Sequence, residues 1–231
     1  MGLQAVIFDF DGVIADDERI HMAGFQHALA AHEIELSEAA YFSRYVGLDD
    51  RDGFRAMLRD AGRDPGSDEL AEMMRKKEHR FRELVRERVT IFPGVRELLS
   101  GLRDGEHALP IAIGSGALSS EIRLVLDIAG LSSYFDEIVA ADDVSRGKPD
   151  PELFLTACER LARQRPEVTP QGCLVIEDSP SGLRAARAAG MSTVAVTNSF
   201  PPESLEADLV IGSLEELDRA RCAALIEAQE H

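Results

Sequence analysis

The sequence predicts an α/β fold: a doubly wound, Rossmann-like parallel sheet with helices on both faces, and a small α-helical domain inserted into it. Short apolar runs typical of buried parallel strands recur along the chain, and helical patterns separate most of them. Residues 17–88 interrupt this alternation, because they contain helical patterns and no convincing strand. We therefore expect a core domain formed by residues 1–16 and 89–231, and a helical domain formed by residues 17–88.

Six segments have the composition of buried strands. Each is short and rich in Val, Ile, Leu and Ala, as in strands that are covered on both faces. Because helices connect most of them, the strands should run parallel in one sheet. The segments are Ala5–Phe10, Ile111–Gly114, Ile138–Ala140, Cys173–Glu177, Thr193–Val196 and Leu209–Ile211.

Capping residues place helices between these strands. An apolar face that runs up to Gly130 predicts a helix that ends at this glycine. Asp150 followed by Pro151, and Ser179 followed by Pro180, each combine an N-cap residue with a proline at the first helical position. A helix should therefore begin at each of the two prolines.

The inserted domain contains three apolar stripes at helical spacing, with a turn at Gly62–Ser67 between the last two. Each stripe predicts one helix of the domain. The stripes are Met22, Phe25 and Leu29; then Phe54, Met57, Leu58 and Ala61; then Leu70, Met73, Met74, Phe81 and Leu84.

Composition limits the classes of function. The formal net charge of -17 argues against binding to nucleic acid or to anionic membranes. The chain begins with a strand-like segment, and no apolar run approaches the roughly 20 residues of a membrane span. Cys158, Cys173 and Cys222 are widely spaced and form no C-x-x-C pair, so we expect reduced, structural thiols in a cytoplasmic protein.

Polar residues follow four of the predicted strands. In an open parallel sheet, ligands bind beyond the carboxyl ends of the strands, so these residues should converge although they are distant in sequence. They are Asp9 with Asp11, Ser115, Lys148, and Glu177 with Asp178.

The acids of this set predict a metal-assisted phosphoryl transfer. Asp9 and Asp11 lie two residues apart at a strand end, and such close carboxylates repel each other unless a cation or proton intervenes. Asp178 adds a third acid, which makes an all-oxygen site suited to Mg²⁺. One carboxylate can attack phosphorus and the other can protonate the leaving oxygen. The alternative is that Asp9 and Asp11 only form a turn.

Three further residues are candidates for binding a phosphate group. The Ser115 hydroxyl and the backbone N–H groups near Gly116 can hold phosphate oxygens, although a plain helix N-cap explains Ser115 as well. Lys148 lies in a proline-stiffened loop, where its ammonium group would neutralise charge on the transferring group. The alternative for Lys148 is an ordinary exposed lysine.

The inserted domain offers candidates for substrate contact. Lys77 lies on the apolar side of its predicted helix, so its side chain must snorkel to water or point into a cleft. His21 and Arg51 are further candidates, with an ordinary helix residue and a surface ion pair as the alternative interpretations. Residues 17–88 are also close to neutral, whereas the remainder of the chain carries most of the negative charge. This suits a domain that meets an anionic substrate, and solvated helix faces are the alternative explanation.

Four motifs in this order resemble the haloacid dehalogenase (HAD) superfamily, in the subgroup with a helical cap that includes β-phosphoglucomutase and related sugar-phosphate phosphatases. The resemblance covers essentially the whole chain. The motifs are DFDGVIAD at 9–16, IGSGA at 113–117, GKPDPE at 147–152 and VIEDSPSG at 175–182.

The resemblance implies a role for each site residue. Asp9 would be the nucleophile and Asp11 the general acid and base, while Ser115 and Lys148 would bind phosphate. It further implies that Mg²⁺ is held by Asp9, the backbone carbonyl of Asp11 and Asp178, with Glu177 adjacent or bound through water, and that the cap closes over the substrate.

The same resemblance narrows the reaction. Family dehalogenases lack an acid two residues after the nucleophile, so retention of Asp11 implies cleavage or transfer of a phosphoester. We expect a phosphatase that hydrolyses a small phosphorylated metabolite. The alternatives are a phosphomutase, which would use His21, Arg51 and Lys77 in its cap, and a non-catalytic binding protein. The Gly47–Arg51 loop is one residue longer than the corresponding mutase stretch, which favours the phosphatase. The sequence predicts neither the substrate nor the oligomeric state.

Overall fold

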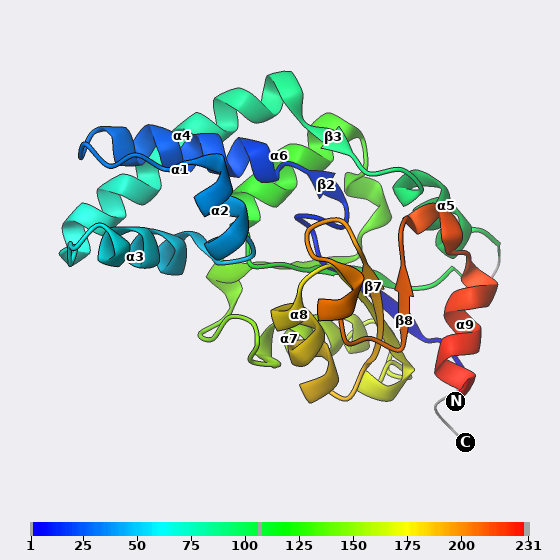
Figure 1. Cartoon of the computed structure of the whole chain (residues 1–231). Helices are drawn as coiled ribbons and strands as arrows, with labels where there is room; N and C mark the ends of the chain where they lie inside the picture. Colours follow the sequence, from blue (N-terminus) through cyan, green and yellow to red (C-terminus); the bar gives the residue numbers. More distant parts are fainter. Residues whose placement is uncertain (1, 106–107, 229–231) are drawn as a thin grey trace. The chain divides into compact units, whose positions relative to one another are not determined.

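A six-stranded parallel sheet with strand order β5-β4-β1-β6-β7-β8 forms the centre of the larger of two compact units. The computed structural model describes residues 2–105 and 108–228 (Figure 1). Phe8 of β1 pairs with Ile113 of β4 and with Ile176 of β6, so the carboxyl ends of these three strands lie level. The strands are β1 Ala5–Phe8, β4 Ile111–Gly114, β5 Glu137–Val139, β6 Cys173–Glu177, β7 Ser192–Val196 and β8 Leu209–Ile211.

The predicted doubly wound sheet is confirmed, and its first strand differs from the prediction at one end. We predicted a strand that reaches Phe10, but β1 ends at Phe8. The Phe10 carbonyl accepts hydrogen bonds from the N–H groups of Ile14 and Ala15, which turns the chain sharply after Asp9. The Asp9 N–H still binds the Ile176 carbonyl of β6 at 2.8 Å, so Asp9 continues the pairing with β6 and the turn begins after it. Strand alternation therefore does not set the direction of the Asp11 side chain.

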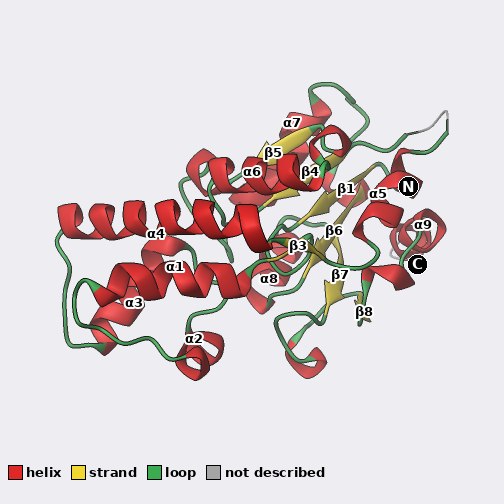
Figure 2. Cartoon of the chain, turned by 90° about the horizontal axis from the view of Figure 1, so that it is seen from above, coloured by secondary structure: helices red, strands yellow, loops and turns green. Residues whose placement is uncertain are grey.

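Helices of the same unit pack on this sheet. α7 lies over β4 and β5, and α8 lies beside it over β6 and β7; α9 packs on β6 and on α5 (Figure 2). Short 3₁₀ turns at Ser132–Tyr134, Ala141–Asp143, Pro170–Gly172, Pro202–Ser204 and Leu214–Glu216 complete the described connections. The helices are α5 Val95–Arg103, α6 Ser119–Ala129, α7 Glu152–Ala162, α8 Pro180–Ala188 and α9 Arg219–Ala228.

The capping predictions hold at two of the three positions. Gly130 ends α6 in the left-handed conformation at φ 66°. Ser179 caps α8, because its hydroxyl accepts a hydrogen bond from the Gly182 N–H. The third helix, α7, begins one residue later than predicted: Pro151 occupies the N-cap, while an Asp150 carboxylate oxygen accepts the Glu152 N–H at 3.0 Å.

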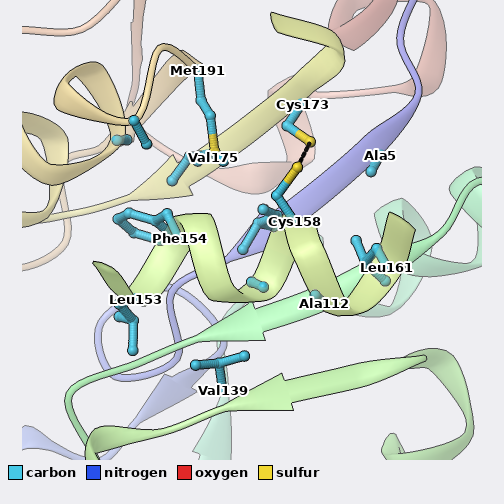
Figure 3. Close-up of a cluster of buried hydrophobic side chains, with 14 of the residues drawn as sticks. Ala5, Ala112, Val139, Leu153, Phe154, Cys158, Leu161, Cys173, Val175 and Met191 are labelled. Atoms are coloured by element: carbon cyan, nitrogen blue, oxygen red, sulfur yellow. Dashed lines mark hydrogen bonds between the residues drawn. The ribbon is translucent and has the colours of Figure 1, made fainter. Parts of the chain in front are cut away.

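Side chains of α7 and α8 form the core on one face of the sheet (Figure 3). Phe154 of α7 packs there beside Val175 of β6 and Met191. Cys158 and Cys173 belong to the same cluster, with their sulfur atoms 3.8 Å apart. Together with Cys222 they are buried free thiols, as expected from their spacing.

Asp16–Thr90 forms the second unit, close to the predicted range of residues 17–88. The chain enters it through β2 (Ala15–Asp16) and leaves it through β3 (Thr90–Ile91), and these two short strands pair. Inside the unit, α1 packs along α4, and Phe25, Phe54 and their neighbours fill the space between the helices. The helices are α1 Glu18–Ala30, α2 Glu38–Arg44, α3 Asp50–Asp60 and α4 Ser67–Arg88.

Two details of the helical unit differ from the prediction. Ala61, expected on the apolar stripe of α3, follows the helix as its C-cap and is exposed. The short helix α2, which Ser37 caps, was not predicted. With both differences, the unit is still helical apart from β2 and β3, the two short paired strands through which the chain enters and leaves it. Within residues 2–105 and 108–228, no helix combines the length and apolar character needed to cross a bilayer.

Candidate active site

The turn after β1, the end of β6 and the loop before α7 bring two acids and one lysine together. Lys148 Nζ lies 2.8 Å from Asp9 Oδ1 and 2.6 Å from Glu177 Oε1. All three side chains are almost entirely shielded from solvent. Burial opposes the charge of the lysine, but the two carboxylates outweigh this effect and raise the pKa of Lys148, so the ammonium group stays charged.

Glu177 is held as a carboxylate by groups around both of its oxygens. Oε1 binds Lys148, while Oε2 accepts the N–H groups of Asp178 at 2.7 Å and Ser179 at 2.5 Å, at the start of α8. Burial opposes the ionised form, but Lys148 and these hydrogen bonds prevail, so the pKa of Glu177 is lowered. Gly182 completes the fit, because a Cβ atom there would overlap the Glu177 carboxylate.

In Asp9 and Asp178, the effect of burial on the pKa outweighs the contacts that favour the ionised carboxylate. Burial raises the pKa of both carboxyls well above the ordinary value, and the neighbouring charge of Glu177 adds to this effect. Asp9, Glu177 and Asp178 can each supply one oxygen such that the three atoms lie within 4.8 Å of one another. A divalent cation would relieve this crowding, and an all-oxygen donor set suits Mg²⁺, so these residues fit the ion.

Gly12 permits a close approach between the turn after β1 and Asp178. Its φ of +77° is in the region that favours glycine, and a Cβ atom would overlap the Asp178 carboxylate. The loop after β7 contacts both partners: the Ser199 hydroxyl donates to Asp178 Oδ2, and Asn198 Nδ2 donates to the Gly12 carbonyl at 2.7 Å. Asn198 and Ser199 were not among the residues predicted from the sequence.

Ser115 directly follows β4, the strand that pairs with β1 and so lies next to the strand that leads to Asp9. Its side chain is buried, and its hydroxyl oxygen accepts the Ala117 N–H at 3.1 Å. The alternative of a plain helix N-cap is wrong, because Leu118 is the N-cap of α6. At Gly116, an added Cβ atom would meet nothing within 4 Å, so the space beside this residue is open.

The Phe154 ring packs against the Lys148 ammonium group, and this contact was not predicted from the sequence. Lys148 Nζ lies 5.3 Å from the centre of the Phe154 ring, a cation–π contact. The same ring packs on Gly114, where an added Cβ atom would lie 3.1 Å from it. Because the Lys148 side chain is only 11% exposed, the alternative of an ordinary surface lysine is wrong.

The model of the family described as haloacid dehalogenase-like hydrolase matches residues 6–196. The chain belongs to this family. The predicted relationship is thereby confirmed.

Relatives of this hydrolase include two phosphatases. It is 30% identical over 193 residues to a phosphorylated carbohydrates phosphatase of Thermotoga maritima, covering 83% of this chain and 84% of that protein. It is 32% identical over 196 residues to a fructose-1-phosphate phosphatase of Escherichia coli, covering 83% and 95%. A crystal structure of β-phosphoglucomutase from Clostridium difficile superposes with a TM-score of 0.86 at 27% identity, covering 99% of each chain. The hydrolase is therefore an enzyme of the phosphatase and phosphotransferase type.

The helical unit of the hydrolase contains its own buried charged cluster. Lys77 Nζ of α4 lies 2.7 Å from Asp50 Oδ1 of α3 and 2.8 Å from His21 Nδ1 of α1. The rings of Phe25 and Phe81 flank the ammonium group at 5.5 and 5.2 Å. The side chain of Lys77 is wholly buried. The interpretation that it snorkels to water is therefore wrong.

Arg51, the remaining candidate of the helical unit, lies next to Asp50 at the start of α3 and is exposed. The acid that approaches Lys77 is therefore the neighbour of the arginine we had selected. Asp50 was not among the predicted site residues, because nothing in the pattern of charges indicates that α3 and α4 bring it to Lys77.

We expect replacement of Lys77 by methionine to lower the free energy of unfolding of the helical unit by about 3–5 kcal/mol. The change would leave the largely buried Asp50 carboxylate without its cation, which is the costly way to break an ion pair. Denaturant unfolding of K77M and of the neighbouring K76M measures this effect.

Lys76 is the matched control, because its side chain is 39% exposed and reaches Glu72 only at 3.8 Å. K76M should change the free energy of unfolding by no more than about 0.5 kcal/mol. Adding Asp50→Asn to K77M should restore part of the lost stability. Equal effects of K76M and K77M would contradict the importance of the buried pair.

Proposed function

We propose that the hydrolase is a magnesium-dependent phosphatase that hydrolyses a small phosphomonoester, in particular a sugar phosphate, through an aspartyl-phosphate intermediate. The observation that supports this most directly is the position of Lys148, which lies between Asp9 and Glu177 while Asp178 lies beside them. A buried ammonium group, whose charge the neighbouring carboxylates stabilise, next to the Asp9 carboxylate suits attack on an anionic phosphate.

We assign the metal site to the acids that the family resemblance indicated. Asp9, the backbone carbonyl of Asp11 and Asp178 would hold the ion, with Glu177 acting through water. Both oxygens of Glu177 already have protein partners, which supports an indirect role. When bound, Mg²⁺ supplies positive charge that offsets the repulsion between the carboxylates and a phosphate dianion.

In the first half of the proposed reaction, Asp9 forms a bond to phosphorus while the bond from phosphorus to the sugar oxygen breaks. Lys148 holds Asp9 through Oδ1 and so fixes the position of the carboxylate that would attack. Asp11 donates its proton to the departing oxygen, so that the leaving group is a neutral alcohol. The Ser115 hydroxyl, the N–H groups around Gly116 and the Lys148 ammonium would bind the phosphate oxygens.

In the second half, water hydrolyses the aspartyl phosphate. Asp11, now ionised, takes a proton from the water molecule as its oxygen attacks phosphorus. The bond between phosphorus and Asp9 breaks, inorganic phosphate leaves, and Asp9 and Asp11 return to their starting states. The balance is one phosphomonoester and one water consumed, and one alcohol and one phosphate formed.

We favour a phosphatase over a phosphomutase because of the charges in the helical unit. A mutase must also bind a bisphosphate intermediate, and so needs cationic groups for a second phosphate. The charge of Lys77 is already matched by Asp50, and Arg51 lies apart from it on the exposed side of α3. We retain His21, Arg51 and Lys77 as candidate substrate contacts of a cap domain, with the phosphorylated substrate as the proposed partner.

Phosphate release from a panel of sugar phosphates tests the proposed function. We expect turnover with Mg²⁺ and loss of turnover when EDTA removes the ion, followed by recovery when excess Mg²⁺ is restored. β-Glucose 1-phosphate separates the two enzymes: a phosphatase releases phosphate, whereas a mutase forms glucose 6-phosphate. No metal-dependent turnover on the whole panel would favour a binding protein instead.

The affinity for Mg²⁺ should increase as the pH is raised from mildly acidic to neutral values. Burial raises the pKa of Asp9 and of Asp178 in the metal-free protein, so each carboxyl keeps its proton to a higher pH than usual. The ion must displace these protons, and this competition weakens as the pH rises. Titrations of Mg²⁺ followed by thermal unfolding at several pH values measure the trend. An affinity that does not change with pH would contradict it.

A further inference from the structure

The loop after β7 contacts the proposed metal site, although none of the four motifs includes it. β7 ends at Val196, and the Thr197 N–H still binds the Ile211 carbonyl, so the loop begins from a fixed point at the sheet edge. The next two residues each use their side chain on the site. Asn198 donates to the Gly12 carbonyl, and Ser199 donates to the Asp178 carboxylate.

The packing around Gly12 makes these contacts specific. A Cβ atom at Gly12 would overlap Asp178 Oδ2 and would lie 2.7 Å from the Ser199 hydroxyl oxygen. Three chain segments therefore meet in direct contact: the turn after β1, the end of β6 and the loop after β7. Only a glycine leaves room for the hydrogen bond between Ser199 and Asp178 in this position.

The Ser199 contact restrains the Asp178 carboxylate. The Ser199 hydroxyl donates to Oδ2 and limits rotation of the carboxylate, which fixes the direction in which its oxygens face a cation. Asp178 itself is only 4% exposed, so water has little access to replace a lost hydrogen bond. Loss of a group that orients a metal ligand in this way typically weakens metal binding by about 10- to 100-fold.

We propose that Ser199 is a positioning residue that orients Asp178 for the divalent cation, and that Asn198 fixes the Gly12 turn against it. This inference rests on the proposed function, because it requires the magnesium site. In this proposal Ser199 acts through Asp178.

Direct binding of Mn²⁺, measured by electron paramagnetic resonance, tests the proposal without relying on activity. Mn²⁺ stands in for Mg²⁺ at an all-oxygen site. We expect Ser199→Ala to weaken binding by about 10- to 100-fold, the usual cost of losing such a contact. Ser199→Thr keeps the hydroxyl group and should retain most of the affinity.

Ser204→Ala is the matched control. Ser204 lies in the same loop, but its hydroxyl donates to the Pro201 carbonyl and does not contact the site. This variant should bind Mn²⁺ like the wild type. Thermal unfolding of every metal-free variant confirms that the proteins compared are folded.

The outcomes separate the inference from the proposed function. If the wild type binds Mn²⁺ and Ser199→Ala binds it within about twofold of the wild type, the positioning role is wrong while the magnesium site stands. If the wild type binds no Mn²⁺, both are wrong. If Ser199→Thr loses as much affinity as Ser199→Ala, the hydroxyl is not the group that matters, and the inference is overturned.

A second measurement distinguishes positioning from general damage. In phosphate-release assays, Ser199→Ala should need 10- to 100-fold more Mg²⁺ for half-maximal turnover, while turnover at saturating Mg²⁺ stays close to that of the wild type. A loss of turnover that excess Mg²⁺ does not restore would contradict a role confined to Asp178. Asn198→Ala should show a smaller shift in the same direction, because it acts through the backbone of Gly12.

Discussion

Replacing Asp9 by asparagine is expected to reduce turnover by a factor on the order of 10⁶, the scale seen when a catalytic nucleophile is removed. A neutral amide cannot form the aspartyl phosphate, and the remaining residues only bind and orient the substrate. The fold should survive, because the pKa of Asp9 is raised by burial and the folded protein accommodates a neutral group at this position well.

Rapid acid quenching followed by mass spectrometry tests the same assignment. In the wild type, the peptide that contains Asp9 should gain one phosphoryl group during turnover, and in Asp9→Asn it should not. Asp127→Asn is the control, since Asp127 is an exposed acid on α6 whose carboxylate binds Ser132. Residual activity of Asp9→Asn above about 1% of the wild type would exclude Asp9 as the nucleophile.

The strand-end rule explains why so much of the site can be predicted from sequence. Parallel strands place their carboxyl ends at one edge, and the register confirms that β1, β4 and β6 end level. Asp9 and Glu177 therefore meet around Lys148 although they are far apart along the chain. No detailed knowledge of side chains is needed for that step.

The same rule also explains what was missed. Asn198 and Ser199 follow β7 just as Glu177 ends β6, so applying the rule to one more strand would have included them. The groups that these two side chains contact could not be predicted in the same way. The contact of Ser199 with Asp178 depends on how closely Gly12 approaches Asp178, and that distance follows from packing. Phe154 is a similar case, since its pattern on α7 indicates a core residue and nothing more.

The helical unit shows where periodicity is insufficient. Three apolar stripes predicted α1, α3 and α4, because a helix of several turns repeats its pattern often enough to be recognised. The short helix α2 repeats its pattern too few times to be recognised. The pattern also placed Lys77 on the inner face of α4, but its partner Asp50 belongs to another helix, and the pairing of two helices is a property of the folded unit.

Replacing Asp11 by asparagine should slow the hydrolysis of a sugar phosphate by roughly 10²–10⁴-fold, the usual contribution of acid–base catalysis. The variant keeps the shape of the side chain and loses the group that protonates the leaving oxygen and later accepts a proton from water. Asp9 remains able to attack, so the two halves of the reaction should be affected differently for different leaving groups.

Para-nitrophenyl phosphate reveals this difference, because nitrophenolate leaves without a proton. Asp11→Asn should release about one equivalent of nitrophenol per enzyme in a fast burst, after which turnover is slow, since water attacks the aspartyl phosphate without a general base. With a sugar phosphate the same variant should show no burst, because the first half also needs the proton. Stopped-flow absorbance and quenched-flow phosphate assays measure the two cases. A wild-type rate with both substrates would remove Asp11 from the mechanism, whereas the combination of burst and slow turnover would assign it both proton transfers.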